Sequence, residues 1–318
     1  MVEYYLTQSL APSTQKTYKS GKTKYINFCT QSNYDPLPVV EDTLCKFAAS
    51  IADQGLKHTT IKSYLSAIRH MQIMSGFGDP FVQSLPKLEY VLRGIKLDQA
   101  KKGQENVRVR LPMTPSILRK MRVVLERERS NFDNIMLWAA CCTCFFGFLR
   151  SGEIVVPTAT SYDPAAHLSF GDVTVDRMDA PTIAQITIKA SKTDPFRKGI
   201  SIYVGKTDND LCPVAALTSY LAARGGQPGP FFRMKDGRPL TRDLFVSQVK
   251  TILTQAGIDA TKYSGHSFRI GAASTAAARG VEDSMIRTLG RWESAAYLLY
   301  VRVPRERLAI LSQTLSLN

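Results

Sequence analysis

The first hundred residues alternate between apolar residues at helical spacing and short polar joints such as NYDPLP and GFGDP. The clearest period runs through Ile61, Leu65, Ile68 and Met71, as on the buried face of a helix. Residues 1–100 are therefore predicted to form a compact helical unit. Its expected helices are a basic one capped by Ser13 or Thr14, a second over 41–52, a third starting at Thr59 or Thr60, and a fourth over 85–97.

The pattern changes after residue 100. Residues 101–112 are polar and basic without a sustained apolar period, which is typical of an interdomain linker. Thr114 followed by Pro115 predicts a helix start, and the apolar run 136–149 predicts a buried helix. Three alternating segments, 168–175, 182–190 and 198–204, predict a small antiparallel sheet with a tight connection at 191–199.

Helical patterns return from Leu211 to the end of the chain, where Leu308, Leu311 and Leu315 would lie along one side of a C-terminal helix. Residues 113–318 are accordingly expected to form a second, mixed α/β domain that ends in this helix. The fold class predicted for the whole chain is mainly α with a small antiparallel β-sheet.

The composition is that of an ordinary globular protein: 44% of the 318 residues are hydrophobic. The sequence has no apolar run of about 18 residues that could span a bilayer. The N-terminus lacks the basic-then-apolar order of a secretory signal, so the cysteines are expected to be reduced. No ligand set with zinc spacing surrounds Cys142 and Cys144, and all six cysteines are predicted to be buried thiols: Cys29, Cys45, Cys141, Cys142, Cys144 and Cys212.

Charge narrows the choice of partner. A formal net charge of +14 and a pI near 9.5 suit a polyanion, because lysines and arginines that neutralise phosphates release counterions and gain affinity. Nucleic acid is favoured over a membrane surface. The alternative is a protein that merely carries surplus surface lysine, so motifs must decide.

Two clusters could act on a phosphate. In GFLRSGEI, Arg150 follows an apolar helix, and its fork of donors suits phosphodiester oxygens, with Glu153 placed to orient it. An internal ion pair between Arg150 and Glu153 is the alternative. In YSGHSFRIG, His266 and Arg269 lie three residues apart at the start of a helix, where the helix dipole favours an anion; a capping or core histidine is the alternative.

The segment LGRWESAAYLLYVR supplies a third cluster. Trp292 has an indole N–H that can donate to a phosphate oxygen, although tryptophans more often serve as core residues. Tyr297 and Tyr300 follow on a short predicted helix. A tyrosine hydroxyl has a pKa near 10, so a nucleophilic tyrosine needs arginines nearby to stabilise its phenolate.

In these motifs the chain resembles the tyrosine recombinases, and the resemblance covers essentially all of it. The family's R-x-G-E-like box is matched by Arg150-Ser-Gly-Glu153, and its H-x-x-R box by His266-Ser-Phe-Arg269. Its hairpin lysine is matched by Lys192 in Ser191-Lys192-Thr193, its His or Trp position by Trp292, and its nucleophile by Tyr300. The resemblance implies a core-binding domain at 1–100, a linker at 101–112 and a catalytic domain at 113–318.

One spacing departs from the family pattern. The commonest arrangement puts the tyrosine nine residues after the His or Trp position, whereas Tyr300 is eight after Trp292. Tyr297 is therefore a rival, and Tyr300 is preferred because the following Val301-Arg302 resembles the family's ending. The residue patterns of the segments GHSFRIGAAS and LGRWESAAY are most similar to those of recombinases of eukaryotic mobile elements of the Crypton or DIRS type.

The activity that this resemblance implies is DNA strand cleavage and religation through a 3′-phosphotyrosine, for integration or excision of a mobile element. It implies no metal and no nucleotide cofactor. The partners would be double-stranded DNA with specific recombination sites and further copies of the chain, as a dimer on each site and a homo-tetramer on synapsed DNA. The location would be the nucleus in a eukaryote, otherwise the nucleoid or cytoplasm.

The contacts expected to DNA outside the catalytic cluster are Lys16, Lys62, Arg69, Lys101, Lys102 and Arg108. Two other functions stay open. A type IB topoisomerase uses a similar set of side chains to relax supercoils without exchanging strands, and a domesticated DNA-binding protein would keep the clamp without the chemistry. Dependence on protein concentration distinguishes the topoisomerase, because only recombination requires synapsed protomers.

Overall fold

A computed structural model describes residues 1–103, 110–128, 131–177, 179–191, 194 and 196–302 of the chain. The chain divides into two compact units, Met1–Val107 and Arg108–Asn318. The division falls within 101–112, the segment expected to be a linker. The beginning of that segment is helical, however, because the last helix of the first unit extends to Lys101.

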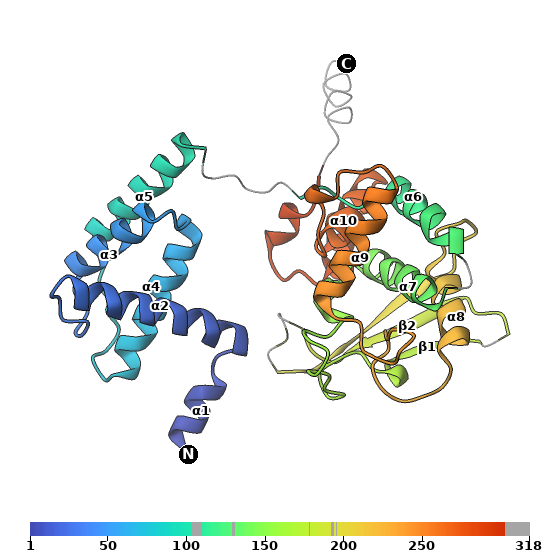
Figure 1. Ribbon diagram of the computed structural model, residues 1–318, viewed down its shortest axis with the longest axis horizontal. Helices are drawn as coiled ribbons and strands as arrows, with labels where there is room; N and C mark the ends of the chain where they lie inside the picture. The colour runs from blue at the N-terminus through green and yellow to red at the C-terminus, as the bar shows by residue number, and fades with distance from the viewer. Residues whose placement is uncertain (104–109, 129–130, 178, 192–193, 195, 303–318) are drawn as a thin grey trace. The chain divides into compact units, whose positions relative to one another are not determined.

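The described residues of the first unit form helices joined by turns and loops (Figure 1). Helix α2 packs on α4 and α3 packs on α5, so that Tyr25, Phe47 and Ile61 are fully buried between them. The four expected helices are present, preceded by a short helix that the sequence pattern did not predict. The bounds are α1 Val2–Gln8, α2 Pro12–Gln31, α3 Glu41–Asp53, α4 His58–Met74 and α5 Pro86–Lys101.

Two predicted helix starts in this unit were wrong. Helix α2 has Ala11 at its N-cap, so Ser13 and Thr14 lie inside its first turn rather than before it. Proline is preorganised for the first helical position, and Pro12 therefore begins the helix earlier than a side-chain cap would. Helix α4 likewise begins at His58, ahead of Thr59 and Thr60.

The second unit surrounds a larger core with helices and one small sheet (Figure 1). At the start of α6 the Thr114 hydroxyl accepts a hydrogen bond from the Ile117 N–H at 3.3 Å, which confirms the predicted cap. The helices are α6 Pro115–Leu125, α7 Phe132–Phe146, α8 Pro213–Arg224, α9 Arg242–Gln255, α10 Ser267–Ala278 and α11 Asp283–Gly290, with 3₁₀ turns η1 Glu126–Glu128, η2 Ser151–Glu153, η3 Phe170–Asp172, η4 Ala260–Lys262 and η5 Ala295–Leu299.

The sheet has the predicted antiparallel order. Strands β1 (Val173–Val175), β2 (Ile183–Ile188) and β3 (Ile200–Gly205) pair so that Val173 faces Ile186 and Ile186 faces Ile202. Alternate residues of β2 are buried, and α8 packs against β2 and β3. The predicted fold class, mainly α with a small antiparallel sheet, is confirmed.

All six cysteines are free and buried, as predicted. Burial raises the pKa of Cys141, Cys142 and Cys144 far above the ordinary thiol value, so these side chains serve as small apolar packing groups. Within the described residues, no helix combines the length and the apolar character that crossing a membrane requires.

Helix α10 runs through the middle of the second unit and relies on small side chains. A Cβ added at Gly271 would overlap the backbone carbonyl of Met113, whose N–H donates to the Ser267 carbonyl at 2.8 Å. Backbone therefore packs directly on backbone at this crossing, and no side chain fits between the two segments.

We expect Gly271→Ala to destabilise the second unit by about 1–3 kcal/mol, since backbone atoms must move to admit the methyl group. Gly94→Ala in exposed α5 is the matched control, because its added Cβ meets nothing within 4 Å and alanine favours a helix. Thermal unfolding followed by circular dichroism measures both. A melting temperature for Gly271→Ala equal to that of the wild type would contradict the close approach.

Candidate active site

The candidate site begins in the loop that follows α7. This helix ends at Phe146 rather than at residue 149 as predicted, and Phe148 then adopts a positive φ of 51°. The turn places Arg150 at the N-cap of η2 instead of on the apolar helix itself. The Glu153 carboxylate accepts from the Arg150 backbone N–H at 2.8 Å and from Arg150 Nη1 at 3.1 Å.

Glu153 also binds an arginine from a distant part of the chain. Arg291 Nη2 donates to Glu153 Oε2 at 2.9 Å, across 138 residues of sequence. The Glu153 side chain is 4% exposed, and the side chains of Arg150 and Arg291 are 18% and 12% exposed. The ion pair weighed as an alternative for Arg150 is thus present, but it belongs to a larger cluster in which one carboxylate faces two guanidinium groups.

The N-terminus of α10 reaches the same place. His266 is the N-cap residue and Arg269 lies in the first turn of the helix. The approach is close, because a Cβ at Gly265 would collide with the Ser151 hydroxyl beside Arg150. The GHSFR and RSGE motifs, far apart in sequence, therefore form one site.

Arg269 is fully buried. Its Nη1 donates to the Phe148 carbonyl at 2.6 Å and its Nη2 donates to the Gly290 carbonyl, while its guanidinium carbon lies 4.2 Å from the Trp292 ring centroid. Burial, together with repulsion from Arg150 and Arg291, lowers the pKa of Arg269 to about 9. The group is still charged at pH 7.

The two candidate tyrosines have different surroundings. Tyr297 is buried and donates its hydroxyl proton to Asp283 Oδ2 at 2.7 Å, and this hydrogen bond to a carboxylate raises its pKa. The ring of Tyr300 is half-buried, 5.0 Å from the Trp292 ring and 5.5 Å from the Arg269 guanidinium carbon. Of the two, Tyr300 is the tyrosine beside the arginine cluster.

Polar groups without partners gather here. Five buried side-chain N or O atoms in the described part of the chain have no hydrogen-bond partner, and three of them are Arg269 Nε, Arg291 Nη1 and Trp292 Nε1. All three are donors. Since a buried donor is rarely left unpaired, the cluster is suited to an anion that supplies acceptor oxygens.

A cavity of about 620 Å³ opens beside this cluster, between α11 and the β2–β3 connection. Arg291 and Trp292 line it on one side, and Ser191, Asp194 and Lys198 of the connection line it on the other. Lys192 lies outside the described residues. Its described neighbours Ser191 and Asp194 line the cavity.

Sequence comparison supplies one curated relative. The chain is 23% identical over 303 residues to the integrase/recombinase xerD homolog of Selenomonas ruminantium, and the alignment covers 91% of this chain and 81% of the relative. No protein-family profile matches the chain.

Solved structures share the fold. The XerH site-specific recombinase bound to difH substrate superposes with a TM-score of 0.61 at 16% identity, over 93% of this chain and 78% of that one. The Tn1549 transposon integrase in complex with transposon right end DNA gives 0.55 at 14% identity, over 94% and 93% of the two chains. A lambda integrase dimer bound to a COC′ core site gives 0.52 at 14% identity, over 94% and 74%.

The chain therefore has the fold of these site-specific recombinases and integrases.

The sequence motifs did not single out two residues of this candidate site. Arg291 stands directly before Trp292 and nine residues before Tyr300, so the spacing departure noted for Trp292 was the signal that could have found it. Ser274 on α10 donates to the Tyr300 carbonyl at 3.1 Å and accepts from the Arg302 N–H at 2.9 Å. It attaches the tyrosine segment to the helix that carries His266 and Arg269.

The other predicted positions belong to the first unit or lie outside the described residues. Lys16 and Lys62 are exposed on α2 and α4, and Arg69 is exposed but paired with Asp79 at 2.9 Å. Lys101 is exposed at the end of α5, Lys102 pairs with Asp98 at 2.7 Å, and Arg108 and the predicted C-terminal helix lie outside the described residues. No group of three His, Cys, Asp or Glu side chains that could hold a metal occurs in the described part of the chain.

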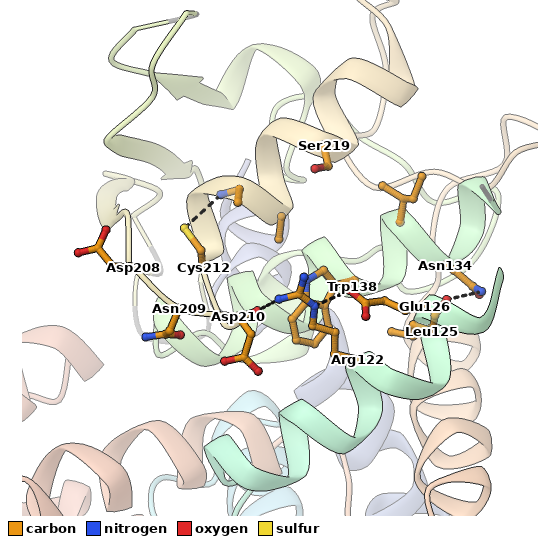
Figure 2. A pocket seen from close by; sticks show the side chains of 13 residues that line it. Arg122, Leu125, Glu126, Asn134, Trp138, Asp208, Asn209, Asp210, Cys212 and Ser219 are labelled. Atoms are coloured by element: carbon orange, nitrogen blue, oxygen red, sulfur yellow. Dashed lines mark hydrogen bonds and ion pairs between the residues drawn. The ribbon is translucent and has the colours of Figure 1, made fainter. Parts of the chain in front are cut away.

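A second cavity, of about 590 Å³, lies elsewhere in the second unit (Figure 2). Arg122 and Trp138 line it together with Cys212, whose sulfur accepts from the Ala215 N–H at 3.4 Å. None of the predicted catalytic residues borders it, so it is separate from the candidate site.

The pH dependence of stability tests the electrostatics. Burial, together with the positive charges of Arg110, Arg242, Arg150 and Arg269, lowers the pKa of His266 below the usual 6.5. The folded state disfavours protonated His266, so neutral His266 is compatible with the full free energy of unfolding above about pH 6.5. Part of that free energy is lost as the pH falls through the lowered pKa of the folded state, because His266 must then be protonated among positive charges.

We therefore expect wild type to lose more unfolding free energy than His266→Asn between pH 8 and pH 5.5. Urea unfolding followed by tryptophan fluorescence suits this measurement, because Trp138 and Trp292 both lie in the second unit. Equal losses for the two proteins would mean that His266 does not titrate against the arginine cluster.

Proposed function

We propose that this protein is a site-specific DNA recombinase that cleaves and rejoins strands through a covalent bond between Tyr300 and a backbone phosphate. One observation carries the proposal. The ring of Tyr300 lies beside the guanidinium of Arg269, in a cluster where buried donors have no acceptor of their own. A scissile phosphate supplies the missing acceptor oxygens and the missing negative charge.

In this proposal, Arg150, Arg269 and Trp292 hold the non-bridging oxygens of the phosphate, with Glu153 keeping Arg150 in place. The pentavalent transition state carries more negative charge than the ground state, so donors that are already in position lower its free energy selectively. The guanidinium groups are held by carbonyls and by Glu153 before DNA arrives, and little reorganisation is needed.

The proton transfers follow from the same arrangement. As the bond from Tyr300 Oη to phosphorus forms, neutral His266 accepts the phenol proton, and the lowered pKa of His266 keeps it available as a base. As the bond from phosphorus to the 5′ oxygen breaks, Lys192 donates a proton to the leaving group. The products are a 3′-phosphotyrosine and a free 5′ hydroxyl, and attack by a 5′ hydroxyl from another strand reverses the step without an external energy source.

Strand exchange needs more than one active site. We infer a dimer on each recombination site and a homo-tetramer on synapsed DNA, with Lys16, Lys62, Arg69, Lys101, Lys102 and Arg108 contacting the DNA backbone. The further expectation of a mobile element of the Crypton or DIRS type, and with it a nuclear location, rests on the GHSFRIGAAS and LGRWESAAY segments. Integration of a mobile element agrees with the similarity to a transposon integrase.

The nucleophile is tested with a duplex selected from a random library for specific binding, then nicked near the cleavage point so that the adduct is trapped. We expect wild type and Tyr297→Phe to form a DNA-linked band on a denaturing gel without Mg²⁺, because the hydroxyl of Tyr297 is committed to Asp283. Tyr300→Phe should form none. A bound duplex that yields no adduct with wild type would point to a DNA-binding protein without chemistry.

The assembly is tested by varying protein concentration on a supercoiled plasmid that carries two copies of the selected site. Recombinant product should rise with a higher power of concentration than adduct formation does, since exchange requires protomers on both sites to meet. Supercoil relaxation at low concentration with no recombinant product would instead support a type IB topoisomerase.

A further inference from the structure

Arg291 occupies a backbone conformation that does not suit an arginine. It follows the last turn of α11 with φ 54° and ψ 49°, in the left-handed region where helices usually end on glycine because a Cβ is strained there. The described residues other than glycine adopt a positive φ at four positions, and two of these, Phe148 and Arg291, border the active site. Strain retained beside a reactive centre suggests that the side chain has a task there.

The hydrogen bonds of Arg291 leave its guanidinium half used. Its Nη2 donates to Glu153, but its Nη1 is buried without a partner. Both carboxylate oxygens of Glu153 would have a hydrogen-bond donor without Arg291, since they accept from the backbone and the side chain of Arg150. A purely structural ion pair would not explain a buried N–H group left without an acceptor.

The charges around Arg291 are unbalanced. The positive charges of Arg150, Arg269 and Arg291 repel one another, and the carboxylate of Glu153 attracts them. Burial lowers the pKa of Arg291, and the attraction of Glu153 offsets part of this effect. Three guanidinium groups around one carboxylate are stabilised when a further anion enters.

Arg291 also borders a cavity, with 12% of its side chain exposed. It lines the cavity of about 620 Å³ together with Trp292, opposite Ser191 and Lys198. The Gly290 carbonyl immediately before it accepts from Arg269, so Arg291 and Arg269 are linked through adjacent backbone. The charges of the two guanidinium groups repel each other, and an anion close to both would relieve this repulsion.

We propose that Arg291 is a third arginine of the phosphate clamp, donating through Nη1 to a non-bridging oxygen of the scissile phosphate while Glu153 holds its Nη2. The inference rests on the recombinase function proposed above and adds a catalytic residue to it. Arg291 forms and breaks no covalent bond; it compensates the negative charge that develops as Tyr300 attacks. Arginine suits this double task because its fork can serve two partners at once.

The test is single-turnover cleavage of the nicked duplex by wild type, Arg291→Gln, Arg291→Lys and Arg238→Gln. The last is the control for loss of one charge, since Arg238 is an exposed residue paired with Asp236 at the surface. Each protein is assayed on a native scissile phosphate and on a methylphosphonate, in which a methyl group replaces one charged oxygen. Melting curves and DNA binding are measured for all four proteins.

On the native phosphate we expect Arg291→Gln to cleave about 10²–10³-fold more slowly than wild type, with DNA binding nearly unchanged. On the methylphosphonate the transition state carries one charge less, so the deficit should shrink to about tenfold or below. Arg291→Lys should fall between wild type and Arg291→Gln, and Arg238→Gln should match wild type. If Arg291 only supports the fold, its replacement should slow cleavage of both substrates by the same factor.

Four outcomes overturn the proposal. Native cleavage by Arg291→Gln within about threefold of wild type, or an equal deficit on both substrates, removes Arg291 from the clamp while leaving the recombinase function intact. Failure of wild type and Arg238→Gln to cleave a duplex that they bind rejects the recombinase function, and this inference with it. If Arg291→Gln does not fold, the rate deficits of Arg291→Lys on the two substrates are compared in the same way. Cleavage of the native phosphate by Arg291→Lys at the wild-type rate then overturns the proposal.

Discussion

The burial of one guanidinium group governs the architecture of the second unit. Arg269 has no exposed surface, and a charge in that position must be held by acceptors in place at all times. The carbonyls of Phe148 and Gly290 provide them, one from the loop after α7 and one from the end of α11. Three segments distant in sequence are thereby fixed around one side chain, and the strained turn at Phe148 is explained because it aims a carbonyl at Arg269.

The same arrangement prepares the site for an anion. Arginines held by backbone carbonyls and by Glu153 cannot move away from one another, although their charges repel and lower the pKa of Arg269. His266 at the start of α10 meets the same positive field and is kept neutral. Folding supplies the free energy that holds these positive charges together. A phosphate bound among them would relieve their repulsion and would not have to bring the side chains into position.

Selection between the tyrosines follows from hydrogen bonding. Asp283 accepts from the Tyr297 hydroxyl, which leaves Tyr297 as a buried structural residue. Tyr300, one turn further, is tied through its backbone to Ser274 on α10. The proposed nucleophile and the residues proposed to hold the phosphate thus lie in the same compact unit of one chain.

The sequence by itself determined what depends on neighbouring residues: the helical periods, the antiparallel β-sheet, the Thr114 cap, the three-residue spacing of His266 and Arg269, and the Arg150–Glu153 pair. Local rules failed where a competing local preference or a distant contact prevailed, as at Pro12, which starts α2 before the expected cap, and at Phe148, which ends α7 early. Only the tertiary structure joined Glu153 to Arg291 and distinguished Tyr300 from Tyr297. Hydrogen bonds and charge repulsion act through space, and no period or spacing along the chain records which carboxylate a remote arginine or tyrosine will meet.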